Sequence, residues 1–78
     1  MKYLKEFQEE LHEVNIQDIL DIFLTNCDEI YAMAEKRFID GYKEYGTSSF
    51  KKTSEQLEQE IKEELADCLV YKAISNVR

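Results

Sequence analysis

The feature that most constrains this chain is an unbroken stretch of helix-favouring sequence between residues 16 and 45. Its apolar residues recur at spacings of three and four, a pattern typical of one face of an α-helix. They are Ile16, Leu20, Phe23, Cys27, Ile30, Ala34, Phe38, Tyr42 and Tyr45. The chain contains no proline that would end such a helix. The pattern therefore predicts a single helix over 16–45, about 45 Å long.

Further apolar residues widen the apolar surface of this helix well beyond one stripe. They are Ile19, Ile22, Leu24, Tyr31, Met33 and Ile39. A helix with so much apolar surface needs more partners than its two neighbours in the chain. We therefore expect a homo-oligomer, a dimer or a larger assembly.

Shorter periodic patterns on either side predict two more helices. Residues 2–13 carry an apolar stripe with a charged outer face. Asn15 fits the N-cap of the helix that follows, although the first helix could instead continue through it with a kink. At the other end, Thr53-Ser54-Glu55-Gln56 has the form of a capping box that begins a helix over 54–76.

These elements predict one all-α domain over residues 1–78. Gly46 ends the long helix, and the short connection that follows has Phe50 as its buried anchor. Because the connection is short, we expect a helical hairpin of two long antiparallel helices, with the short N-terminal helix beside it. A chain of 78 residues buries only a limited core, so oligomerisation is expected to complete the bundle.

Three small residues lie within the helical patterns: Gly41, Cys27 and Cys68. A glycine inside a helix costs about 1 kcal/mol relative to alanine. Gly41 therefore indicates either the close approach of a backbone or ligand, which we favour, or a bend. Cys27 and Cys68 fall at apolar positions and are expected to be core thiols in a reducing cytoplasm. No apolar run reaches the length of a membrane span, so no membrane association is expected.

The charge balance narrows the classes of partner. The net charge of −7 argues against a general nucleic-acid binder, which needs a basic surface for phosphates. The same charge is compatible with a bound Mg²⁺ ion or with a basic partner protein.

The clearest candidate site is an acidic row on the last predicted helix. Glu60, Glu64 and Asp67 fall within a sector of about 60° on a helical wheel, at the border of the apolar stripe. Like charges four residues apart destabilise a helix. A divalent cation would offset that cost, and Mg²⁺ prefers carboxylate oxygens. The alternative is an ordinary solvated acidic face.

A second candidate site is the cationic end of the long helix and the loop after it. In an antiparallel hairpin this end would face the start of the last helix, where it would suit a phosphorylated ligand. The candidate substrate-binding residues are Arg37, Lys43, Tyr45, Lys51 and Tyr71. Ordinary ion pairing between helices would also explain the basic residues. No nucleophile–base pair or glycine-rich phosphate loop is present, so no catalytic residue is assigned.

Two segments together resemble a known family. They are Arg37-Phe38-Ile39-Asp40-Gly41-Tyr42-Lys43-Glu44-Tyr45-Gly46 and Glu60-Ile61-Lys62-Glu63-Glu64-Leu65-Ala66-Asp67-Cys68-Leu69-Val70-Tyr71, with Phe50 between them. Over roughly residues 30–76 the chain resembles small phage and bacterial proteins of the MazG-like, all-α nucleoside triphosphate pyrophosphohydrolase superfamily.

The resemblance implies a helical bundle completed by a second subunit and Mg²⁺-dependent hydrolysis of a nucleoside triphosphate to monophosphate and pyrophosphate. The Glu-x-x-Asp half of the family's metal-binding pattern corresponds to Glu64 and Asp67, with Glu60 one turn earlier. The other half, Glu-Glu-x-x-Glu on the preceding helix, is missing. The resemblance is thus compatible with an active enzyme and with a non-catalytic nucleotide-binding relative.

Two readings from other classes remain open. The net charge and the wide apolar face also suit a small acidic interaction protein, of phage origin, that binds or inhibits a basic host protein. The other is a helical oligomerisation module without a ligand.

Overall fold

A computed structural model describes residues 2–78 as a chain of helices. The α-helices are α1 (Leu4–Glu13), α2 (Ile16–Thr25), α3 (Cys27–Tyr45) and α4 (Ser54–Val77). A short 3₁₀-helix, η1 (Ser48–Lys51), lies between α3 and α4. The prediction of an all-α fold is confirmed, and the ends of α1 and α4 lie within two residues of their predicted positions. In the part of the chain described here, no helix is long and apolar enough to span a membrane.

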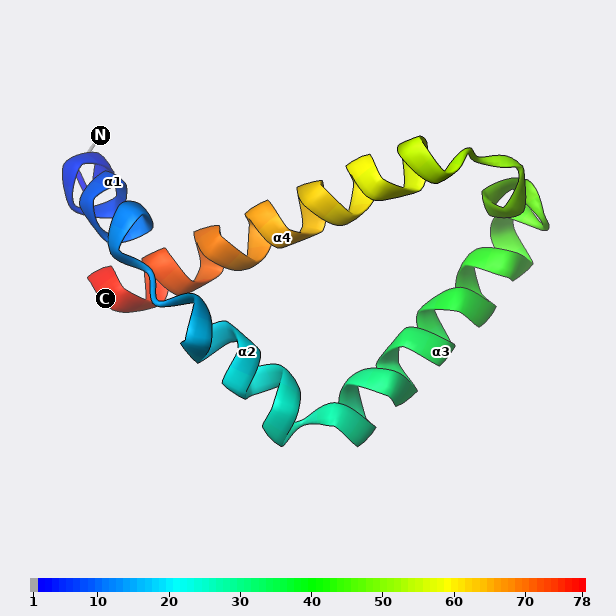
Figure 1. Cartoon of the computed structure of the whole chain (residues 1–78), viewed down its shortest axis with the longest axis horizontal. Helices are drawn as coiled ribbons and strands as arrows, with labels where there is room; N and C mark the ends of the chain where they lie inside the picture. The colour runs from blue at the N-terminus through cyan, green and yellow to red at the C-terminus, as the bar shows by residue number, and fades with distance from the viewer. Residues whose placement is uncertain (1) are drawn as a thin grey trace.

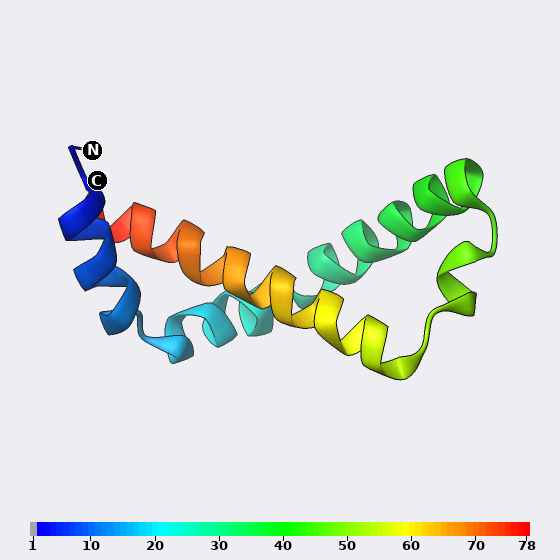
Figure 2. The same cartoon turned by 90° about the horizontal axis from the view of Figure 1, so that it is seen from above.

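The helices form an open frame rather than a closed bundle (Figure 1). α4 makes one long side, α2 and α3 make the other two, and α1 lies against the C-terminal end of α4. In Figure 1, α3 and α4 diverge from the turn that joins them, and Figure 2 shows the same frame from above. The predicted antiparallel hairpin of two long helices is thus not seen within one chain.

The small core lies where α1 meets the last turns of α4. Ala73 is fully buried there, and it is the one buried residue in the span 2–78. Phe7 and Leu11 of α1 are half-buried, as are Leu69 and Val70 of α4. Alanine at position 73 leaves room for α1 to lie close to the backbone of α4. This contact accounts for most of the tertiary packing in the chain.

The prediction of one continuous helix over 16–45 is wrong at Asn26. The Asn26 side-chain amide donates to the carbonyl of Ile22 at 2.8 Å, and the Thr25 hydroxyl donates to the carbonyl of Asp21 at 2.7 Å. These side chains take up carbonyls that a continuing helix would pair with its own N–H groups. The backbone leaves helical geometry at Asn26, with φ −126° and ψ 25°, and α3 starts in a new direction. The rings of Phe23 and Tyr31 pack edge to face across the break, with their centroids 6.1 Å apart.

Helix starts follow the sequence signals more closely. The Asn15 side chain accepts a hydrogen bond from the Gln17 N–H at 2.9 Å, so Asn15 is the N-cap of α2. Helix α1 ends at Glu13 instead of continuing through Asn15 with a kink. Gly46 takes a left-handed φ of 65° after α3, as the sequence predicts for a glycine that ends a helix.

Other positions differ from expectation because the frame is open. A Cβ atom added at Gly41 would meet nothing within 4 Å, so no other segment of residues 2–78 approaches it closely, contrary to the interpretation that we favoured. Phe50 is 72% exposed and contacts Phe38 edge to face at 5.9 Å instead of anchoring a core. Both thiols are free, but Cys27 is half-buried and Cys68 is exposed. The core that these residues were expected to enter is not formed by one chain.

The dimensions of the chain measure how open it is. The radius of gyration is 15.7 Å, against about 11–12 Å expected for a compact domain of this length. The accessible surface is 7044 Å², against about 5000 Å² for a folded protein of 9.3 kDa. Large apolar side chains on every helix remain exposed.

Candidate functional site

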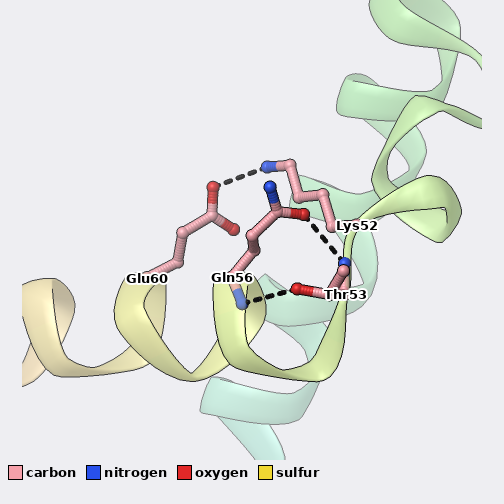
Figure 3. Close-up of polar contacts among 4 residues, drawn as sticks. All are labelled: Lys52, Thr53, Gln56 and Glu60. Atoms are coloured by element: carbon pink, nitrogen blue, oxygen red, sulfur yellow. Dashed lines mark hydrogen bonds and ion pairs between the residues drawn. The ribbon is translucent and has the colours of Figure 1, made fainter.

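The start of α4 is the best-defined polar site in the chain (Figure 3). The Thr53 side chain accepts a hydrogen bond from the Gln56 N–H at 3.1 Å, and the Gln56 side chain accepts one from the Thr53 N–H at 2.8 Å. This reciprocal capping box is the one that the sequence predicts. It satisfies N–H groups of the first turn and fixes the direction in which the chain enters α4.

The capping box also positions Lys52. The Lys52 backbone is extended, with φ −73° and ψ 145°. Its side chain runs along the first turns of α4 toward Glu60 (Figure 3). Its Nζ lies 2.5 Å from Glu60 Oε1. The two side chains are 38% and 50% exposed, so the ion pair contributes little to stability. The pair is more informative about the site, because it places the Lys52 ammonium group against a carboxylate of the acidic row.

Two of the three residues of the acidic row line an open hollow on α4. Glu60 and Glu64 border this hollow of about 730 Å³, together with Glu63. Its apolar lining consists of Leu57, Ile61, Leu65 and Cys68. Asp67, the third predicted metal ligand, does not line it. Within residues 2–78 no three His, Cys, Asp or Glu residues converge closely enough to hold a metal ion. One chain therefore offers a carboxylate pair, not a three-carboxylate site.

The predicted substrate-binding residues are spread over the frame. Arg37, Lys43 and Tyr45 belong to α3, Lys51 to η1 and Tyr71 to α4. Tyr45 is 66% exposed and Tyr71 is 71% exposed. In the described chain none of the five forms an ion pair or hydrogen bond with the acidic row. The open angle between α3 and α4 leaves Lys52 as the basic residue that meets this row.

Lys52 was not among the predicted ligand-binding residues, although it belongs to the same basic loop. The signal that could have identified it is its place directly before the N-cap. In this chain the Lys52 side chain runs along the first turns of α4 and reaches a carboxylate eight residues on. Glu60 is that carboxylate.

A second hollow lies at the other end of α4, between it and α1. It has a volume of about 640 Å³ and is lined by Tyr3, Leu4, Phe7, Val70, Ile74, Val77 and Arg78. None of the predicted site residues lines it. Its walls are almost wholly apolar, so it offers packing surface rather than polar chemistry.

Comparison with known proteins adds no identification. No model of a known protein family matches the chain, and neither a curated protein nor a solved structure matches it.

Proposed function

We propose that the chain is a MazG-like nucleotide-binding protein, either a Mg²⁺-dependent nucleoside triphosphate pyrophosphohydrolase or a non-catalytic relative. The observation that carries the proposal is the arrangement at the start of α4. Two carboxylates, Glu60 and Glu64, share one hollow, and a lysine ammonium already lies against one of them. Carboxylate and ammonium together suit a metal–phosphate ligand.

The donor set fits Mg²⁺ in number and in kind. Mg²⁺ usually binds through one or two carboxylates and completes its coordination with water and substrate phosphates. Glu60 and Glu64 are one helical turn apart and could supply that pair, whereas Asp67 lies outside the hollow and would have to reorient to join them. The ion would neutralise the charge of the phosphates and make a phosphorus atom more open to attack by water.

Lys52 has a defined role in this proposal. In the free chain its ammonium neutralises Glu60. When Glu60 binds a cation, Lys52 is released and can donate to a phosphate oxygen of the incoming ligand. Arg37, Lys43, Tyr45, Lys51 and Tyr71 join it only if a neighbouring chain or a closing of α3 onto α4 brings them near. A homo-oligomer is therefore part of the proposal, and a neighbouring chain could also supply the missing half of the carboxylate pattern.

Calorimetry with Mg²⁺ and a panel of nucleoside triphosphates tests the proposal. We expect nucleotide binding that requires Mg²⁺ and is lost in Glu64→Gln and in Asp67→Asn, with helicity unchanged. Glu58→Gln is the matched control, because it removes the same charge from an exposed position of α4 away from the hollow. Equal binding by Glu64→Gln and Glu58→Gln, or no binding to any nucleotide, would exclude the acidic row as the site.

A pyrophosphate-release assay then separates the two forms of the proposal. Release that depends on Mg²⁺ and on Glu64 identifies an enzyme. Binding without release identifies a non-catalytic relative.

The second candidate function is a small acidic protein that binds a basic partner. The observation that favours it is the net charge of −7 on a chain whose carboxylates are mostly solvent-exposed. Absence of nucleotide binding, together with a complex that dissociates as salt is raised, would favour this function.

A further inference from the structure

The chain exposes far more surface than a folded protein of its size. The excess over a compact protein of the same mass is about 2000 Å². If two chains each covered that excess against the other, the interface would bury about 4000 Å² in total, within the range of obligate homodimers. The uncovered area is thus of the size that a second copy of the same chain would cover.

One apolar stripe on α4 is left uncovered by the rest of residues 2–78. It consists of Leu57, Ile61, Leu65 and Cys68, spaced four, four and three residues apart. Leu57, Ile61 and Leu65 are 40%, 59% and 56% exposed, and Cys68 is exposed as well. The stripe carries no charge of its own and forms the apolar lining of the hollow that Glu60 and Glu64 border. A solvated helix face would not concentrate four such residues.

The stripe lies on the side of α4 that α1 leaves free. Helix α1 contacts the other side, where Ala73 is buried and Val77 lines the second hollow. At 100° per residue, Ile61 and Val77 point about 160° apart around the helix axis. Helix α4 is therefore apolar on two opposite sides, and the fold of one chain covers only the side toward α1.

We propose that this stripe packs against a second copy of the chain, so that α4 forms the seam of a homodimer. A basic partner would contact the carboxylates beside the stripe. The stripe itself is uncharged, so it matches another apolar surface, such as the same stripe of a second chain. In a two-fold dimer the same residues from both chains meet, so the stripe covers its own copy. The inference stands on surface area and side-chain placement and does not depend on nucleotide binding.

The molar mass of the wild-type chain and of two variants tests the seam. Leu65→Glu places a charge in the stripe. Gln59→Glu adds the same charge to α4 two residues before Ile61, on the opposite side of the helix. By light scattering we expect twice the chain mass for wild type and Gln59→Glu, and a dissociation constant raised at least 100-fold for Leu65→Glu.

Both substituted residues are exposed in the single chain, so circular dichroism should show α4 intact in each variant. A wild-type monomer at micromolar concentration would overturn the proposal. So would a Leu65→Glu variant that associates as tightly as wild type.

Cys68 reports on the seam directly. Its thiol is exposed in the single chain and would be covered by the second copy. We expect iodoacetamide to modify Cys68 at least tenfold more slowly in wild type than in Leu65→Glu, with Cys27 changing much less. Equal reactivity of Cys68 in the two proteins would place any dimer interface elsewhere and overturn the proposal.

Discussion

The contact between α1 and α4 gives the sharpest prediction about stability. Ala73 is fully buried in it, so replacement by leucine inserts three carbon atoms between two helices that are already in contact. Overpacking of this kind typically costs about 1–3 kcal/mol. The intrinsic helix propensities of alanine and leucine differ by less than about 0.5 kcal/mol, so nearly all of the loss comes from packing. We expect Ala73→Leu to lower the free energy of unfolding by about 2 kcal/mol.

Ala66→Leu is the matched control for this prediction. Ala66 lies on the same helix, two turns earlier, and is exposed. The same substitution there should change the free energy of unfolding by less than about 0.5 kcal/mol. Urea denaturation followed by circular dichroism measures both, with the protein concentration held constant because association adds to apparent stability. With a slope near 1 kcal/mol per molar urea, Ala73→Leu should lower the midpoint by about 2 M.

Two results would refute this reasoning. Equal effects of the two substitutions would mean that α1 does not pack on Ala73. A stabilised Ala73→Leu variant would mean that the site holds empty space.

Three further predictions follow from local contacts and from the open frame. Thr53→Ala removes the capping box and should cost about 1 kcal/mol in urea denaturation, and no change would mean that the first turn of α4 is held by other contacts. Lys52→Met breaks only an exposed ion pair, so it should change stability by less than about 1 kcal/mol while weakening nucleotide binding in calorimetry; unchanged nucleotide binding would contradict the assignment of Lys52 to the ligand. Asn26→Leu removes the hydrogen bond to Ile22 and should slow amide hydrogen exchange around the break as α2 and α3 join; unchanged exchange would show that the break has another cause.

The local structure was largely predictable because its signals are local. Asn15 and Thr53 cap helices as the sequence indicates, since a side-chain oxygen directly before a helix accepts from an N–H group of its first turn. Gly46 ends α3 for an equally local reason. The break at Asn26 was missed because Thr25 and Asn26 lie inside an apolar pattern that remains periodic across them. Nothing in the spacing shows that their side chains bond to carbonyls of the preceding turn.

The placement of the helices was harder to predict, and so was the site. The sequence indicates that α3 and α4 are joined by a short connection, but not the angle at which η1 directs them. That angle separates Arg37 and Lys43 from the acidic row and leaves Lys52 beside it. The positions expected in a core, such as Cys68 and Phe50, are exposed because one chain closes only the contact between α1 and α4.

Small-angle X-ray scattering of the wild-type chain, with the mass determined on the same samples, tests the central claim most directly. The claim is that one chain is unable to close its own core and that a second copy completes it. The account predicts a particle of at least twice 9.3 kDa across the micromolar range. A particle of single-chain mass would contradict it, whether its radius of gyration is the 15.7 Å of the open frame or about 11–12 Å, the size of a compact monomer.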